Sequence, residues 1–126
     1  MNKNEGKTTL VIGASENPER YSNMAMRLLK HYGHPVIAIG RRAGSVDGMA
    51  IQTLSNCKEL SQIDTITLYV NPFHQAEFEE LILGLQPRRV LFNPGTENPD
   101  LYGKLNENGI AFEEACTLVL LRSGQF

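Results

Sequence analysis

The chain has 126 residues, of which 41% are hydrophobic and 21% are charged, and this composition is typical of one globular domain with a single core. Its formal net charge of -2 argues against nucleic acid or an anionic membrane surface as a partner. No apolar run approaches the roughly 18 residues that a membrane-spanning helix needs. We therefore expect one domain over residues 1–126 and no nucleic-acid or membrane partner.

The N-terminus and the cysteines bear on where the protein is located. Residues 1–7 are polar and lack the apolar core of a secretory signal. Cys57 and Cys116 are far apart in the sequence and do not have the spacing of a zinc site. Distant, unpaired cysteines are typical of a reducing compartment, so we expect a cytoplasmic protein without a bound metal.

In the first third of the chain, apolar runs that stop at glycines alternate with an amphipathic segment. Residues 8–13 form a nearly continuous apolar run, which indicates a strand covered on both faces. Ser22 or Asn23 is predicted to cap a helix that ends at Gly33. Residues 36–39 are again apolar and largely β-branched, and they indicate a second strand.

The middle of the chain joins a glycine-rich stretch to a further strand and helix. The predicted elements are an irregular stretch over residues 41–50, an edge strand over 49–53, at most a helical turn over 57–60, a strand over 64–70 and a helix over 72–85. Asp47 and Gly48 predict a tight turn within the irregular stretch. Pro72 suits the first turn of the helix, where its missing N–H is not needed.

The last third repeats the strand–helix unit. Its predicted elements are a strand over residues 89–93, a tight turn over 94–96, a helix capped by Asn98 and ended by Gly109, a strand over 110–113 and an apolar tail over 118–121 of unassigned type. Strands that alternate with helices require right-handed crossovers. We therefore predict a three-layer, Rossmann-like, doubly wound α/β fold with a mainly parallel sheet of about five strands and helices on both faces.

Ligands of doubly wound sheets bind at the carboxyl ends of the strands, so the residues just after each predicted strand are the candidates for a site. Small or conformationally restricted residues expose backbone amides there, while hydroxyls, a helix N-terminus and arginines can bind phosphate groups. The predicted nucleotide site comprises Gly13, Ala14, Ser15, Arg20, Tyr21, Ser22, Gly40, Arg41, Arg42, Asn71, Pro72, Phe73, Pro94, Gly95 and Thr96.

Structural roles compete with functional ones at several of these positions. Turns favour glycine, proline and asparagine without any ligand, and exposed arginines are often only solvated surface charges. A place for Phe73 in the core is slightly favoured over a contact with an adenine ring. His74 and Cys116 have no partner at a spacing that indicates chemistry, so no catalytic residue is assigned and the protein is expected not to be an enzyme.

The order of several short motifs resembles that of a known family, the small bacterial CoA-binding proteins, which are relatives of the CoA-binding domain of the succinyl-CoA synthetase alpha subunit. The motifs that carry this resemblance are Val11–Ser15 with Asn17 and Pro18, Arg20–Ser22, Gly33–Ile37, Asp64 with Tyr69 and Val70, Pro94–Asn98, Asn108–Ile110 and Glu114–Cys116. Two positions depart from the family pattern. Ile39-Gly40-Arg41 replaces a Val-Asn-Pro ending, and Glu114-Ala115 replaces Asp-Arg before the late cysteine.

The resemblance implies a protein that binds CoA or acyl-CoA as a non-catalytic carrier, sensor or partner module, with a homodimer or an unknown protein partner left open. The alternative is an NADP-binding oxidoreductase-like domain, because Arg41 and Arg42 also suit a 2′-phosphate. Ser15 and Pro18 stand where the dinucleotide fingerprint has glycines, and this argues against the alternative. A fold that serves only as an interaction surface is a third interpretation.

Overall fold

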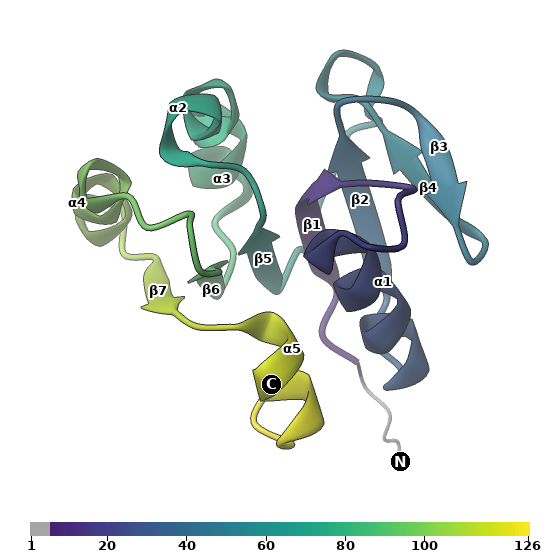
Figure 1. Cartoon of the computed structure of the whole chain (residues 1–126). Helices are drawn as coiled ribbons and strands as arrows, with labels where there is room; N and C mark the ends of the chain where they lie inside the picture. Colours follow the sequence, from purple (N-terminus) through teal and green to yellow (C-terminus); the bar gives the residue numbers. More distant parts are fainter. Residues whose placement is uncertain (1–5) are drawn as a thin grey trace.

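A computed structural model describes residues 6–126, and the strands within that range form a single sheet (Figure 1). Its seven strands follow the order β3-β4-β2-β1-β5-β6-β7. Their bounds are β1 Thr9–Ala14, β2 Val36–Gly40, β3 Gly44–Val46, β4 Met49–Gln52, β5 Thr65–Leu68, β6 Arg89–Phe92 and β7 Ala111–Glu114. All neighbouring strands are parallel except β3 and β4. The α/β class and the mainly parallel sheet are confirmed.

The prediction of about five strands is too low because of the hairpin formed by β3 and β4. Asp47 and Gly48 have φ values of 51° and 83°, which is the geometry of a two-residue hairpin turn. Val46 is the only buried residue of β3, so this three-residue strand shows no alternating pattern in the sequence. The stretch over residues 41–50 that was expected to be irregular thus contains the true edge strand, β3. The predicted edge strand over 49–53 is β4, which lies between β3 and β2 and is not at the edge of the sheet.

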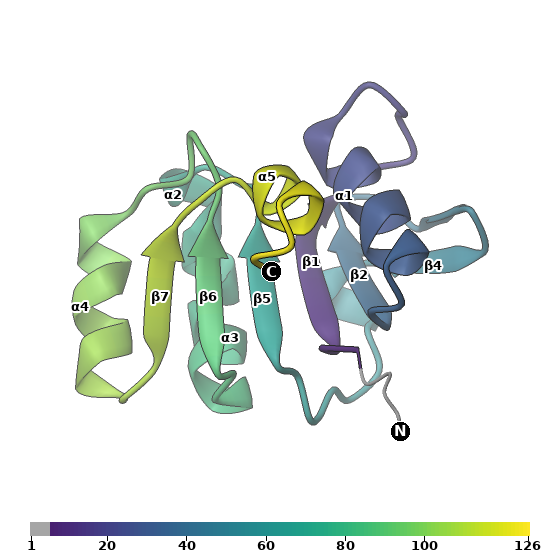
Figure 2. The ribbon, with the colours of Figure 1, turned by 90° about the horizontal axis from the view of Figure 1, so that it is seen from below.

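Helices cover both faces of the sheet, which gives the predicted three layers (Figure 2). Their bounds are α1 Tyr21–His31, α2 Pro72–Gln75, α3 Glu79–Leu85, α4 Pro99–Glu107 and α5 Thr117–Arg122. Leu10 and Ile12 of β1 pack in the core cluster that contains residues of α3 and α4, whereas Val11 packs in the cluster on the side of α1 and α5. None of the helices within residues 6–126 has the length and apolar content needed to cross a membrane.

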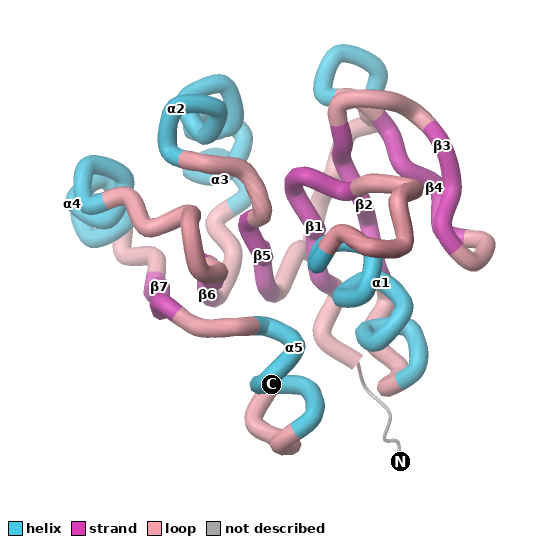
Figure 3. Tube along the Cα trace, viewed as in Figure 1, coloured by secondary structure: helices cyan, strands magenta, loops and turns pink. Residues whose placement is uncertain are grey.

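The strand order changes direction at β1. From β1 the chain forms β2 and the hairpin on one side, and then it crosses to β5 on the other side. Such a switch point opens a crevice at the carboxyl ends of the two central strands. The loops after these strands lie near one another in Figure 3, where loops are pink.

Three helix boundaries differ from the prediction. Helix α1 begins at Tyr21 with Arg20 at its N-cap, so Ser22 and Asn23 do not cap it and lie buried within it. The predicted helix over 72–85 is divided into α2 and α3 by a 3₁₀ turn at Ala76–Phe78. A 3₁₀ turn occupies Leu54–Asn56, ahead of the predicted helical turn at 57–60.

The starts of α2 and α4 agree with the sequence pattern. The Asn71 side chain accepts a hydrogen bond from the N–H of His74, and Pro72 begins α2. Asn98 caps α4 through the N–H of Leu101. The apolar tail without an assigned type is α5.

Candidate functional site

A cavity of about 870 Å³ opens at the switch point, where the loops after β1, β2, β5 and β6 converge. We call it the main cavity. Parallel strands deliver their carboxyl ends to one edge of the sheet, so segments that are far apart in sequence meet here. Twelve of the predicted site residues line it: Gly13, Ala14, Ser15, Arg20, Tyr21, Ser22, Arg41, Arg42, Asn71, Pro94, Gly95 and Thr96.

Gly13 brings the backbone of β1 to the cavity wall in a conformation that disfavours other residues. Its φ is +97°, and a Cβ atom here would lie 3.0 Å from the carbonyl carbon of Tyr69 and from Cγ1 of Val70. The glycine is therefore required by the turn and by the close approach of the segment that follows β5. A side chain at this position would strain the fold as well as narrow the cavity.

The loop between β1 and α1 takes its shape from its own polar side chains. The Ser15 hydroxyl accepts a hydrogen bond from the N–H of Asn17 at 3.0 Å, and the Asn17 side chain accepts one from the N–H of Glu19 at 2.9 Å. From inside α1, the Asn23 amide donates to the Ser15 carbonyl at 3.0 Å. No side chain among the described residues caps α1. The N–H of Asn23 already donates to the carbonyl oxygen of Arg20 at 3.1 Å, whereas the N–H groups of Tyr21 and Ser22 form no hydrogen bond within residues 6–126 and are available to an anion.

Five charged side chains line the main cavity. Arg20, Arg41 and Arg42 are exposed, and within residues 6–126 none of them forms a salt bridge. Glu16 and Glu19 also line the cavity, and they are not among the predicted site residues. Their position in the loop after Gly13 is the signal that would have identified them. The lining carries a net charge of +1, which favours an anionic ligand.

A smaller cavity of about 450 Å³ adjoins the main one, and we call it the side cavity. The two share Gly13, Arg41 and Val70 in their linings. Leu54 and Phe78 give the side cavity an apolar character. Gly40 lines only the side cavity, and a Cβ atom there would collide with the carbonyl oxygen of Ala14.

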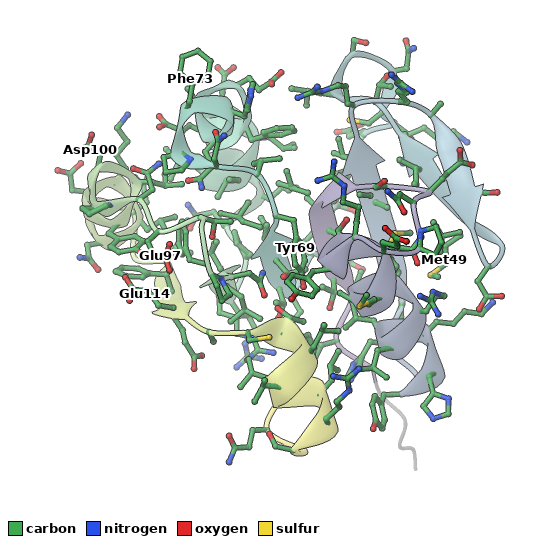
Figure 4. The ribbon with its side chains drawn as sticks, in the orientation of Figure 1. Met49, Tyr69, Phe73, Glu97, Asp100 and Glu114 are labelled. Carbon is green, nitrogen blue, oxygen red and sulfur yellow. The ribbon has the colours of Figure 1, made fainter. Side chains whose placement is uncertain are left out.

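Pro72 and Phe73 line neither cavity. The expectation that Phe73 belongs to the core is wrong, because its side chain is 83% exposed and projects from α2 into solvent (Figure 4). The 3₁₀ turn at Ala76–Phe78 separates α2 from α3, and the apolar stripe begins only with Phe78, at the end of that turn. Gln75 is the buried residue of α2 instead.

Gln75 joins two loops that border the main cavity. Its side-chain nitrogen donates to the carbonyl oxygens of Val70 at 2.9 Å and Thr96 at 2.7 Å, and its oxygen accepts from Asn98 at 2.8 Å. The turns after β5 and β6 are therefore held at a fixed separation. A buried glutamine in a short helix cannot be recognised from the local sequence, and this residue was missed.

Tyr69 lines the main cavity, and Figure 4 shows its side chain between β5 and α5. Burial raises the pKa of Tyr69 to about 12, so the side chain is a neutral phenol near neutral pH. Its hydroxyl is buried and has no hydrogen-bond partner among the described residues. This side chain was also missed, although the resemblance drew attention to its position.

The other candidates for chemistry are separated from one another. His74 lines the side cavity, and Cys116 is a partly buried free thiol at the N-cap of α5. His34 is at the opposite end of the sheet, where its Nδ1 accepts a hydrogen bond from the N–H of Lys7. Within residues 6–126, no group of three His, Cys, Asp or Glu side chains is arranged to hold a metal ion.

A family model described as "CoA binding domain" matches residues 7–122. The chain belongs to the CoA binding domain family. This match covers every residue that lines the two cavities. Comparison with curated proteins gave no match.

Solved structures share the fold of this CoA binding domain. A protein described as "uncharacterized protein" is 44% identical, has a TM-score of 0.90 and aligns over 98% of this chain and 100% of its own. A Thermus thermophilus protein is 22% identical with a TM-score of 0.80, over 96% of this chain and 91% of its own, and shows the same fold.

The same fold occurs as part of a larger enzyme. A dinucleotide-forming acetyl-coenzyme A synthetase from Ca. Korarchaeum cryptofilum, solved with phosphate and ADP, is 15% identical with a TM-score of 0.68. The alignment covers 86% of this chain but only 26% of the synthetase chain. At this identity the likeness concerns the fold alone.

Proposed function

We propose that this CoA binding domain binds coenzyme A or an acyl-CoA and acts as a non-catalytic carrier, sensor or partner module. One observation carries the proposal. Arg20, Arg41 and Arg42, which form no salt bridge within residues 6–126, line the same cavity as the uncapped N-terminus of α1. CoA carries a diphosphate and a 3′-phosphate, with roughly four negative charges near neutral pH.

The diphosphate fits the turn after β1. Ala14 and Ser15 line the cavity beside the start of α1, where N–H groups and the helix dipole favour an anion. Arg20 belongs to the same loop and can add a charge-assisted hydrogen bond. The 3′-phosphate is assigned to Arg41 and Arg42 at the end of β2.

The two ends of the ligand are assigned to different parts of the site. The side cavity suits the adenine ring, because Leu54, Val70 and Phe78 provide an apolar surface next to Arg41. The pantetheine arm would lie along Asn71 and the Pro94–Thr96 turn. Gln75 holds these two loops together, so the arm would meet a preformed wall.

The non-catalytic role is supported by the surroundings of the two most reactive side chains. His74 lines the side cavity and Cys116 lines neither cavity, and within residues 6–126 the side chain of neither forms a hydrogen bond that would activate it. Catalysis by a nucleophile requires such a partner. The acyl group and any protein partner are not assigned.

Isothermal titration calorimetry with CoA and NADP tests this function. CoA is expected to bind more tightly, because Ser15 and Pro18 replace the glycines of the dinucleotide turn. Arg20→Ala should reduce the affinity for CoA about tenfold or more, because a charged hydrogen bond contributes roughly 1.5–3 kcal/mol. Arg88→Ala, which removes an exposed arginine outside both cavities, serves as the control. Tighter binding of NADP would overturn the proposal.

A further inference from the structure

The loop after β1 makes one contact with a distant part of the chain through Glu16. Oε2 of this carboxylate accepts a hydrogen bond from the backbone N–H of Ser45 at 2.9 Å, across 29 residues of sequence. Ser45 belongs to β3, at the edge of the sheet. Figure 3 shows the loop running out to the β3–β4 hairpin before it returns to α1.

Gly44 provides the space for this contact. A Cβ atom at Gly44 would lie 2.5 Å from Oε2 and 2.9 Å from Cγ of Glu16. The backbone of Gly44 is outside the positive-φ region that other residues avoid. The absence of a side chain at this position therefore serves the packing of Glu16 rather than the conformation of the chain.

The charge of Glu16 is unfavourable for an anionic ligand. Its carboxylate lines the main cavity together with Arg41 and Arg42, and it lowers the positive potential that these side chains create. A second carboxylate in the same lining, that of Glu19, makes no side-chain hydrogen bond or salt bridge among the described residues. The two glutamates thus have the same charge in the same cavity but differ in the contact with Ser45.

We propose that Glu16 is a positioning residue that clamps the loop of residues 15–20 to the hairpin. The clamp holds Ser15 and Arg20 in place before the ligand arrives, so less conformational freedom is lost on binding. The inference rests on the proposed function for its ligand, while the clamp itself is present in the free protein.

Four single variants separate the effect of the Glu16–Ser45 hydrogen bond on CoA binding from the effect of the carboxylate charge. Glu16→Ala removes both, whereas Glu16→Gln keeps an oxygen acceptor for Ser45 and removes only the charge. Glu19→Ala and Glu19→Gln remove the same charge without a clamp. We expect Glu16→Ala to reduce the affinity for CoA about two- to tenfold, since a hydrogen bond contributes a net ~0.5–1.5 kcal/mol. Glu16→Gln and both Glu19 variants should bind CoA at least as tightly as the natural protein.

Amide hydrogen exchange at Ser45 provides the readout in the free protein. Exchange should be faster in Glu16→Ala and in Gly44→Ala, which displaces the carboxylate, and unchanged in Glu19→Ala. Unchanged exchange in Glu16→Ala would overturn the clamp. Equal CoA affinities of Glu16→Ala and Glu16→Gln would overturn the positioning role alone. If the natural protein did not bind CoA, the proposed function would fail, and the positioning role with it.

Discussion

Arg41 and Arg42 extend from the end of β2 without a carboxylate partner among the described residues. Lys30 and Lys104 differ in this respect, because their ammonium groups contact Asp47 at 3.7 Å and Glu79 at 2.7 Å. An arginine pair at the wall of a cavity that forms no salt bridge among the described residues is available for a bidentate phosphate contact. The availability of these side chains is a property of single residues and can be tested by substitution.

The double variant Arg41→Ala/Arg42→Ala should reduce the affinity for CoA about ten- to a hundredfold, because a charged hydrogen bond contributes roughly 1.5–3 kcal/mol. Dephospho-CoA lacks only the 3′-phosphate, and its affinity should hardly change. Calorimetry with both ligands measures the ratio. The control is Arg88→Ala/Arg122→Ala, which removes the same charge outside the cavities. Equal losses for the two ligands would place the 3′-phosphate elsewhere.

His34 links stability to pH. Burial lowers the pKa of His34 below its usual 6.5, with a further contribution from the charges of Lys7 and Arg89. Its Nδ1 accepts a hydrogen bond from the backbone N–H of Lys7 at 3.0 Å, and protonation of Nδ1 abolishes this hydrogen bond. The folded protein binds this proton less readily than the unfolded chain, so the contribution is fully present above pH 6.5 and is lost as the pH falls through the folded pKa.

We expect the free energy of unfolding to decrease from pH 7.5 to pH 5.5, and His34→Gln to reduce this decrease. The glutamine oxygen can still accept from Lys7 but does not titrate. Urea titrations at the two pH values give the difference. His31→Gln, at an exposed position, is the control and should retain the pH dependence of the natural protein. The same dependence in His34→Gln would assign it to other groups.

At the scale of elements, α5 depends on buried polar contacts. A helix of six residues is not stable by itself. The side-chain oxygen of Asn93 accepts a hydrogen bond from the backbone N–H of Thr117 at 2.8 Å. Its side-chain nitrogen donates to the hydroxyl of Thr67 at 2.7 Å and to the carbonyl oxygen of Leu68 at 2.9 Å. The hydroxyls of Thr67 and Thr117 are 2.8 Å apart. One side chain at the end of β6 thus joins β5 to the start of α5.

Asn93→Ala should lower the free energy of unfolding by about 1–3 kcal/mol, because it leaves buried groups without partners. Asn106→Ala replaces an exposed asparagine of α4 and should change stability by less than about 0.5 kcal/mol. Urea unfolding of the two variants measures the comparison. Equal effects would show that α5 is held by its apolar contacts alone.

At the scale of the whole molecule, Phe126 connects segments from both ends of the chain at the amino ends of the strands. Its carbonyl oxygen accepts from Lys7 and, at 2.8 Å, from Arg89. The Arg89 guanidinium lies 4.4 Å from the centre of the Phe126 ring, and the ring of His34 lies 4.8 Å from it. These contacts tie the segment after α5 to the starts of β1 and β6.

Phe126→Ala should destabilise the fold by roughly 1–2 kcal/mol, which is less than the ~3–5 kcal/mol of a fully buried phenylalanine because this ring is only half-buried. The Val119→Ala control removes a side chain that is 60% exposed and should have little effect. Thermal and urea unfolding provide the measurement. A Phe126→Ala variant as stable as the control would contradict the connecting role.

Most of the site could be predicted because its residues follow strand ends. Gly13, Arg41 and Asn71 belong to turns that the apolar runs located, and a parallel sheet brings such turns together. Glu16, Gln75 and Asn93 were not selected. Their roles depend on partners that are 29, 21 and 24 residues away, at Ser45, Thr96 and Thr117, and no local pattern encodes those pairs.

The sequence by itself determined the α/β class, the main strands, the turn at Asp47 and Gly48, and the cap of α4 by Asn98, because these follow from side-chain periodicity and local backbone preference. Only the tertiary structure decided the pairing of β3, the helical state of α5 and the exposure of Phe73. These features are short or lack an alternating pattern. Their conformations are stabilised by contacts with distant segments, and such contacts override weak local preferences.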